Sequence, residues 1–295
     1  MLDDFKIGHY TDEARGTGLT AIICEQGAVG GVSVRGAAPA TRETELLKTE
    51  KTVSVVHAIV LSGGSAYGLE GCSGVMAFLR SVNAGVNAGK YKVPIVCGAS
   101  LYDLEYKEFA FPDKNAGVMA GKEAKTNNFT RGIKGVATGA TASKVLGMDY
   151  AVKTGLGIQT YSSGDLEIAV ICGVNPLGDI MENGKIIAGA KDVNGEFIGA
   201  QQVLSSCCFN AFSISNTTIG CIITNAKLTK AQANILSDLA HDGLAQSISP
   251  SHTMFDGDAF FTLASQKVEV DFNMLTALIP SLVARAIRSS VTSIA

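Results

Sequence analysis

Tryptophan is absent from the 295-residue chain, only 6 prolines occur, and charged residues make up 17% of the sequence. Disordered segments are rich in proline and charge, so this scarcity, beside a hydrophobic share of 46%, excludes a largely disordered protein. The formal net charge of −3 provides no positive surplus for nucleic acid or an anionic membrane. We therefore expect one large globular domain over residues 1–295 whose partner is a small molecule, a peptide or another copy of itself.

Disulfide and targeting signals are also missing. The 7 cysteines form no Cys-x-x-Cys pair, and most of them lie in apolar runs, which favours buried free thiols in a reducing compartment. Residues 1–6 are acidic where a secretory signal is basic and then apolar, and no apolar run is expected to span a membrane. These features predict a cytoplasmic protein without a membrane partner.

The common cofactor motifs do not occur. His9, His57, His241 and His252 form no His-Glu-x-x-His pair and no zinc-type spacing with cysteine. A phosphate-binding Gly-x-x-x-x-Gly-Lys loop and a Gly-x-Ser-x-Gly nucleophile turn are lacking as well. The glycine loop at 62–68 precedes a predicted helix, but a tight turn or a backbone-lined pocket is preferred to nucleotide binding. We expect neither a metal nor a cofactor.

Apolar periodicity predicts strands and helices without strict alternation, which favours an α+β fold. Strands are expected at 19–24, 29–35, 57–61, 93–97, 168–174 and 219–224, with a turn at 25–27. Helices are expected at 69–79, 229–248 and 274–287, the last interrupted by Pro280. Residues 132–144 are interpreted as a tight loop running into a helix of small residues, and 180–191 as a hairpin turning at Asn183-Gly184.

A polar pair, Asn216-Thr217, stands directly before the strand predicted at 219–224. If the bond between them broke, Thr217 would carry a hydroxyl and a free α-amine, whose reference pKa is about 7.7–8. The amine could then act as general base for the hydroxyl of the same residue, and no histidine would be needed. The alternative interpretation is an ordinary turn before a strand.

Further polar residues lie at places where catalytic side chains are common. Asp256 and Asp258 are two residues apart, which puts both carboxylates on one face of an extended segment or makes them part of a solvated Asp-Gly turn. Tyr102 and Asn175 follow apolar strands, and Lys144 ends the stretch rich in Gly, Ala and Thr. Each of these residues alone is compatible with a structural role.

Taken together, the motifs resemble one family over nearly the whole chain. The resemblance is carried by 36–44 (GAAPATRET), 57–69 (HAIVLSGGSAYGL), 135–144, 216–220 (NTTIG) and 252–258 (HTMFDGD). The chain is similar in these segments to the P1-type self-processing peptidases. That family includes D-aminopeptidase/esterases, β-peptidyl aminopeptidases and 6-aminohexanoate-oligomer hydrolases. Several long motifs in one order are more specific than any single motif.

The resemblance implies a four-layer α/β/β/α sandwich like that of N-terminal-nucleophile hydrolases, shared with ornithine acetyltransferases. It implies self-cleavage into an α chain, 1–216, and a β chain, 217–295, assembled as a homotetramer of αβ units. The substrate would be a small peptide or amide. The implied site consists of the nucleophile Thr217, the oxyanion donor Asn175, the carboxylates Asp256 and Asp258, and the pocket residues Tyr102 and Lys144.

The sequence alone leaves open which branch of the family the chain resembles most and which reaction it catalyses. Thr217 and Asp256 match the 6-aminohexanoate-oligomer branch, whereas the D-amino and β-peptidyl branches have serine at both positions. One alternative function is an acyltransferase of the ornithine-acetyltransferase type, which passes the acyl group to an amine. Another is a non-enzymatic binding protein that kept the fold and stays uncleaved.

Overall fold

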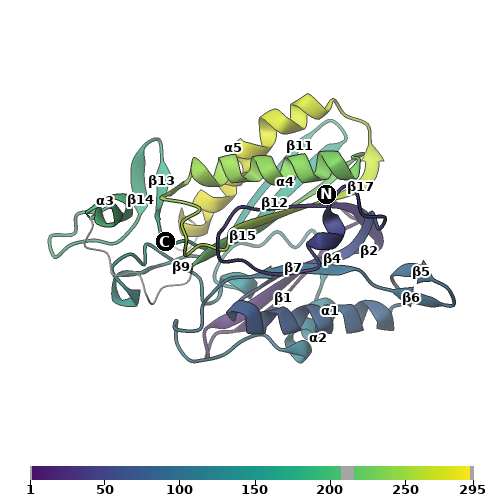
Figure 1. Cartoon of the computed structure of the whole chain (residues 1–295), viewed down its shortest axis with the longest axis horizontal. Coiled ribbons are helices and arrows are strands. Elements are labelled where there is room, and N and C mark those ends of the chain that lie inside the picture. The colour runs from purple at the N-terminus through teal and green to yellow at the C-terminus, as the bar shows by residue number, and fades with distance from the viewer. Residues whose placement is uncertain (1, 207–215, 293–295) are drawn as a thin grey trace.

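The structure is a computed structural model and describes residues 2–206 and 216–292. Its elements form four layers, with helices on the two outer sides and strands between them (Figure 1). Helices α4 (Lys230–Ala245) and α5 (Phe272–Thr292) cover one side. Helices α1 (Glu70–Ser81) and α2 (Lys114–Lys122) cover the other. The described part of the chain therefore has the predicted α/β/β/α architecture.

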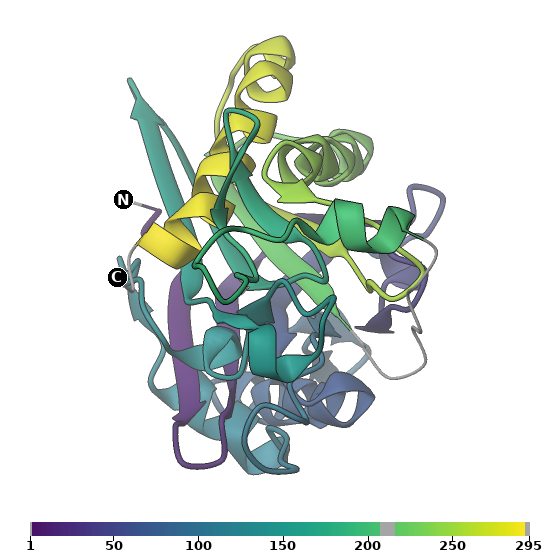
Figure 2. The ribbon, with the colours of Figure 1, turned by 90° about the vertical axis from the view of Figure 1, so that its left-hand side faces the viewer.

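A single sheet supplies both inner layers. In spatial order its strands are β11 (Leu156–Ser163), β12 (Leu166–Asn175), β15 (Thr217–Ala226), β17 (Ala259–Val268), β2 (Thr17–Val34), β4 (Val55–Ser62), β7 (Val96–Ser100) and β3 (Ala40–Arg42). β1 (Lys6–Asp12) pairs with β2, and β8 (Lys125–Thr126) pairs with β1. Figure 2 shows the strands from the side and the helices outside them.

The long strand β2 carries the sheet from one layer to the other. It pairs with β17 through 29–34 and with β4 through 19–29, with a register shift between Ile23 and Ala28. The prediction of two strands separated by a turn at 25–27 is therefore wrong. Gly27, at φ +84°, takes up the extra length as a bulge, which bends a strand without ending it.

Three apolar clusters hold the layers together. The inner cluster lies between the two strand layers and includes Ile59, Ile171, Ile219 and Phe261. A second cluster lies under α4 and α5, and a third lies under α1 and α2. Along β15 the odd-numbered residues from Ile219 point to the inner cluster and Ile222 points to the helices, as the two-residue period of a strand requires.

The remaining elements are short. They comprise α3 (Ala200–Ser205), β5 (Val86–Ala88), β6 (Tyr91–Val93), β9 (Thr141–Ala142), β10 (Val152–Lys153), β13 (Asp179–Glu182), β14 (Lys185–Ala188), β16 (Ile248–Ser249) and four 3₁₀ turns at Glu45–Leu47, Ser65–Leu69, Gly135–Ala137 and Met148–Tyr150. The hairpin β13–β14 turns at Asn183-Gly184 as predicted, both at positive φ. The small-residue helix predicted within 132–144 is wrong, because glycines disfavour a helix there and Ser143 is left-handed at φ 58°.

Helix α5 differs from its prediction in two respects. The helix continues through Pro280 and has 21 residues. By length and composition it could cross a membrane, whereas no segment was expected to be long and apolar enough. About half of it is buried, and its inner face, with Leu275, Ile279 and Val283, packs in the cluster under α4 and α5. This packing compensates for the backbone hydrogen bond that proline removes.

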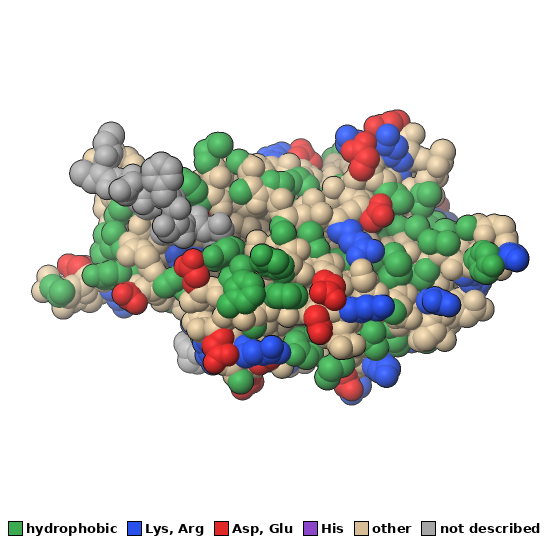
Figure 3. Space-filling model, turned by 60° about the horizontal axis from the view of Figure 1, so that its bottom comes forward, with side chains coloured by type: hydrophobic (Ala, Val, Ile, Leu, Met, Phe, Trp, Pro, Cys, Tyr) green, Lys and Arg blue, Asp and Glu red, His purple; other side chains and the backbone are tan. Residues whose placement is uncertain are grey.

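Other predictions concern cysteines and surface charge. The five cysteines in the described ranges are free and buried, as expected, while Cys207 and Cys208 lie outside them. Burial raises the pKa of Cys24 to about 11 and that of Cys72 to about 12, which suppresses thiolate formation. On the face shown in Figure 3, positive and negative side chains are interspersed with apolar ones rather than gathered by sign.

Candidate active site

Thr217 and Asn175 lie opposite each other at the ends of two paired strands. Asn175 is the last residue of β12, Thr217 is the first of β15, and the antiparallel register pairs them directly. Both share the parity of the inner-facing residues Ile171 and Ile219, so their side chains point between the two strand layers. Directly opposite residues have Cβ atoms about 4.5–5.5 Å apart. The register therefore brings the predicted nucleophile beside the predicted oxyanion donor.

The Thr217 side chain is directed at the bond that precedes it. Its hydroxyl donates to the carbonyl oxygen of Asn216 in a short contact. The backbone N–H of Gly257 donates to that same carbonyl oxygen at 3.2 Å and to Thr217 Oγ1 at 3.2 Å. A Cβ on Gly257 would lie 2.8 Å from Thr217 Oγ1, so only glycine permits this approach. Gly257 was predicted only as part of a turn, because a backbone donor has no signature in the sequence.

Lys144 is a fully buried amine next to this pair. Its Nζ donates to the Thr141 carbonyl at 2.8 Å and to the backbone and side-chain oxygens of Asn175 at 2.9 and 2.7 Å. Burial lowers the pKa of Lys144 to about 7, although the charge of Asp256 acts to raise it. An amine with a pKa near neutrality can hold or release a proton during a reaction.

The loop that carries Lys144 is anchored at its neighbour. Ser143, in the left-handed region, donates through Oγ to Asp179 Oδ1 at 2.5 Å and accepts from Ala190 N at 2.7 Å. Asp179 Oδ2 also accepts from Ala200 N, at the start of α3. Such contacts maintain a strained backbone conformation that would otherwise relax. The contacts of Ser143 and Asp179 therefore fix the direction in which the Lys144 side chain points from the loop.

The Asn175 carboxamide is held in one orientation. Its Oδ1 accepts from Lys144 Nζ and from Thr141 N, and its Nδ2 donates to the Tyr102 carbonyl at 2.9 Å. A carboxamide carries two N–H donors, and one of them is used in this way. The second N–H is the group that an oxyanion beside Thr217 could accept from.

Tyr102 contributes to the site through its main chain. Its hydroxyl donates to Glu105 Oε1 at 2.9 Å, and burial raises its pKa to about 12. Its predicted role as a pocket residue of the site stays a prediction, since no described contact joins the phenol to Thr217. The phenol borders a small cavity lined by Tyr102, Asp103, Glu105, Tyr106, Gly139, Thr141, Lys144 and Met148.

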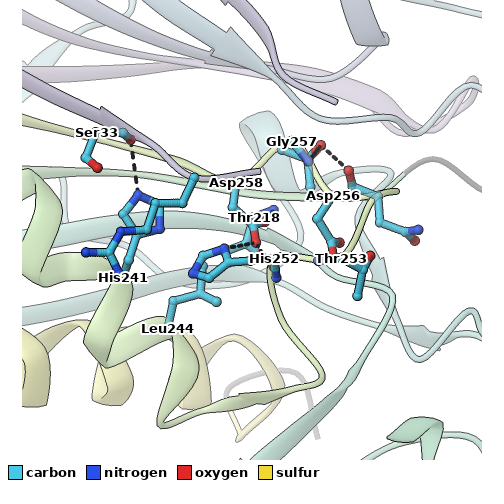
Figure 4. Close-up of polar contacts among 12 residues, drawn as sticks. Ser33, Thr218, His241, Leu244, His252, Thr253, Asp256, Gly257 and Asp258 are labelled. Atoms are coloured by element: carbon cyan, nitrogen blue, oxygen red, sulfur yellow. Dashed lines mark hydrogen bonds and ion pairs between the residues drawn. The ribbon is translucent and has the colours of Figure 1, made fainter. Parts of the chain in front are cut away.

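Asp256 and Asp258 have different surroundings, as Figure 4 shows. Asp256 pairs with Asn216 in an isolated parallel bridge, and its Oδ2 accepts from the backbone N–H of Thr253 at 2.9 Å and from its hydroxyl at 2.6 Å. Burial, and then the charge of Asp258, raise the pKa of Asp256. Asp258 instead accepts from the backbone N–H of Thr218 at 2.7 Å. Neither carboxylate contacts the Thr217 hydroxyl.

Two histidines that carried no functional prediction join Asp258. His252 Nδ1 lies 2.8 Å from Asp258 Oδ2, which also accepts from the backbone N–H of His252 at 3.2 Å. The His241 ring, from α4, packs edge-on against His252 with centroids 4.9 Å apart, and burial lowers its pKa to about 4. His252 and His241 are 11 positions apart, so their sequence spacing carries no signal of this contact. Figure 4 shows the two rings on the helical side of Asp258.

We predict that His252→Ala slows self-cleavage and turnover by about fivefold, the scale of a partly exposed contact between an imidazole and a carboxylate. Without His252 the Asp258 carboxylate can rotate away from Thr218, the residue after the predicted nucleophile. His252→Asn is the matched control, because asparagine tolerates the observed φ of 54° and keeps a side-chain donor. Unchanged rates for His252→Ala in a quantitative cleavage and hydrolysis assay would contradict this role.

The described residues contain no group of three or more His, Cys, Asp or Glu side chains that could hold a metal ion. The prediction that the protein needs neither metal nor cofactor stays a prediction. The groups gathered here instead suit covalent acyl chemistry: a hydroxyl, backbone and carboxamide donors, a buried amine and a carboxylate.

Comparison with known proteins agrees with this arrangement. The model of peptidase family S58 matches residues 2–294 of the chain. An uncharacterised aminopeptidase of Mycobacterium tuberculosis is 36% identical over 286 residues, which cover 90% of this chain and 80% of that protein. A 6-aminohexanoate-oligomer endohydrolase of Kocuria is 29% identical over 269 residues, which cover 89% of this chain and 72% of that protein.

Solved structures support the fold. The L-aminopeptidase D-Ala-esterase/amidase of Ochrobactrum anthropi, described as a variant of the Ntn hydrolase fold, superposes with a TM-score of 0.72 at 13% identity. The match covers 99% of this chain and 85% of that one. A β-aminopeptidase of Burkholderia superposes with a TM-score of 0.66 at 15% identity, covering 97% of this chain and 82% of that chain. At these identities the likeness concerns the architecture of the four layers.

Proposed function

The chain belongs to peptidase family S58, and on this premise we propose that it is a self-processing amide hydrolase. It first cleaves its own Asn216–Thr217 bond and then uses Thr217 as an N-terminal nucleophile on small peptides or amides. The observation that carries the proposal is the Thr217 hydroxyl held against the Asn216 carbonyl, with the Gly257 N–H donating to both.

The first reaction is an N-to-O acyl shift. Thr217 Oγ1 attacks the Asn216 carbonyl carbon through a five-membered ring, the C–N bond breaks, and the hydroxyl proton ends on the released nitrogen. The Gly257 N–H is already directed at the carbonyl oxygen that becomes negative, which is the arrangement of an oxyanion donor. Water then hydrolyses the ester between residue 216 and Thr217, leaving the α chain 1–216 and the β chain 217–295.

In the second reaction the new α-amine of Thr217 acts as the general base. Before cleavage the same nitrogen is part of a peptide bond and cannot take this role. The reference pKa of an α-amine is about 7.7–8, so this group can accept the hydroxyl proton near neutral pH and later deliver it to the leaving amine. The free N–H of Asn175 and the Gly257 N–H stabilise the tetrahedral oxygen. Lys144 orients Asn175 and provides a proton or positive charge beside the developing alkoxide, while Asp258 holds the backbone at Thr218.

Mass spectrometry of the intact protein tests the proposal. We expect two polypeptides, 1–216 and 217–295, in any preparation that hydrolyses amides, because the amine of Thr217 becomes available only after cleavage. An active preparation that contains only the uncut chain would overturn the proposal. An uncut and inactive chain would favour the alternative of a binding protein.

The rival acyltransferase shares the acyl-enzyme and differs in its acceptor. Adding free amino acids to a hydrolysis assay separates the two, since a transferase forms a new amide faster than the free acid. We also propose that αβ units assemble as a homotetramer and that the protein is located in the cytoplasm.

A further inference from the structure

Lys153, a second lysine near the site, is held by three backbone carbonyls. Its Nζ donates to the carbonyl oxygens of Ala137 at 2.8 Å, Ala140 at 2.8 Å and Thr154 at 2.6 Å. A protonated lysine amine has three N–H donors and no acceptor, so these contacts use every donor of the charged form. The side chain of Lys153 therefore ties β10 to the turn between the two alanines.

The turn held by Lys153 leads directly to the groups that orient Asn175. The residue after Ala140 is Thr141, whose backbone N–H donates to Asn175 Oδ1 at 2.9 Å. Thr141 also lies opposite Lys153 in the pairing of β9 with β10, and its carbonyl accepts from Lys144 Nζ. Lys144 in turn donates to Asn175 Oδ1 at 2.7 Å. A shift of this turn would therefore move both donors that hold the oxygen of the carboxamide.

The charged amine of Lys153 is costly where it stands. Burial lowers the pKa of Lys153 to about 7, while the negative charge of Asp103 acts to raise it. Asp103 is itself buried and packs against the same turn, because a Cβ on Gly139 would lie 2.6 Å from Asp103 Cβ. A charged amine is therefore retained where an apolar side chain would cost less, which favours a role for its three donors.

We infer, on the basis of the proposed function, that Lys153 is a positioning residue for Asn175. It fixes the turn 137–140, so that the free N–H of Asn175 points at the tetrahedral oxygen formed beside Thr217. Misplacing a catalytic group by about 1 Å can slow a reaction by about 10²-fold. The Gly257 N–H, which assists self-cleavage, belongs to a different segment. Lys153 therefore serves turnover, whereas self-cleavage proceeds without it.

Steady-state amidase kinetics of Lys153→Met test the inference. Methionine has a similar length and no N–H donor, so we expect the variant to divide at residue 216 and to lower kcat by about 10–10²-fold. KM should stay within about threefold of wild type, because an oxyanion donor acts in the transition state. A wild-type kcat would overturn the inference. A folded variant that stays undivided would overturn it too, because Lys153 would then act on the junction.

Lys230→Met is the matched control. Lys230, at the start of α4, also donates through Nζ to three backbone carbonyls, those of Leu46, Lys51 and Val53, each at 2.9 Å. The substitution therefore removes the same number of contacts outside the turn 137–140. It should lower the temperature of unfolding and leave kcat within about threefold of wild type. Equal losses of kcat in the two methionine variants would make the effect of Lys153 a general one and overturn the inference.

A double-mutant cycle shows whether Lys153 acts through Asn175. In an Asn175→Ala background no carboxamide is left to be oriented, so adding Lys153→Met should change kcat by less than about threefold. A further loss of about tenfold or more in that background would assign Lys153 another role and overturn the inference.

Thermal unfolding checks that each variant is folded. If Lys153→Met does not fold, Lys153→Gln replaces it, because the amide keeps two N–H donors and loses the third together with the charge. The same loss of kcat and the same cycle are then expected. A processed Lys153 variant with wild-type kinetics overturns only this inference, whereas a wild-type enzyme that is active and never cleaved overturns the proposed function.

Discussion

Thr217→Ala is expected to remain one polypeptide of full length and to lose amide hydrolysis by about 10⁴-fold or more, as removal of a covalent nucleophile does. The variant lacks the only hydroxyl that contacts the Asn216 carbonyl among the residues the structure describes, so the acyl shift cannot begin. Without cleavage there is no free amine either, and the substitution removes nucleophile and base together. Intact-mass measurement and an amidase assay on the same sample check both losses.

Thr217→Ser is the matched control for this prediction. Serine keeps the hydroxyl and removes one methyl group, so the variant should still divide at residue 216 and hydrolyse amides. Thermal unfolding should show that the alanine variant is folded, since Thr217 is buried but is replaced by a smaller side chain. Hydrolysis by a folded Thr217→Ala protein at the wild-type rate would assign the nucleophile to another residue.

Asn175→Asp is expected to lower kcat/KM by about 10²–10³-fold, the effect of losing one oxyanion donor. The carboxylate has the shape of the carboxamide, and it can accept from Lys144 Nζ and Thr141 N as Asn175 does. It cannot donate, so it removes the N–H proposed to stabilise the tetrahedral oxygen and adds negative charge where more negative charge develops. Steady-state kinetics on the processed variant measure the loss.

Asn225→Asp is a matched control at the other end of β15. Asn225 has equivalent contacts: its Oδ1 accepts from Glu167 N at 2.9 Å and its Nδ2 donates to the Asp165 carbonyl at 2.8 Å. The same exchange there should affect stability but leave kcat/KM of the folded enzyme within about threefold of wild type. If the two variants lose activity equally, the effect of Asn175→Asp is structural and the oxyanion role is contradicted.

The two aspartates illustrate how the site is divided between the faces of the sheet. Thr217 and Asn175 point between the strand layers, toward the inner cluster. Asp258 stands beside His252 and His241 on the helical side and binds β15 through the backbone N–H of Thr218. Its contacts suit a positioning role, whereas Asp256 lies beside the Asn216–Thr217 bond. The prediction that both carboxylates belong to the catalytic site of Thr217 stays untested.

Much of the fold was predictable because its signals are local. The apolar runs of β12 and β15, the period of α1 and α4, and the Asn183-Gly184 turn each arise from neighbouring residues. The failures concern positions where tertiary contacts outweigh local preference. Packing carries α5 through Pro280, and a bulge at Gly27 continues β2 where a turn was predicted.

Residue types and motif order in the sequence predicted the N-terminal-nucleophile fold, which the solved structures support. They also predicted the Asn216–Thr217 junction and the chemistry of a hydroxyl with its own amine, which stay predictions. They did not reveal that the Gly257 N–H donates to the Asn216 carbonyl, that His252 lies against Asp258, or that the Phe255 carbonyl accepts from the backbone N–H of Asn216. Each of these depends on which segments come side by side when β15 and β17 pair and α4 packs over them. Backbone groups are alike in every residue, so their roles arise from strand register and packing and leave no pattern in the order of side chains.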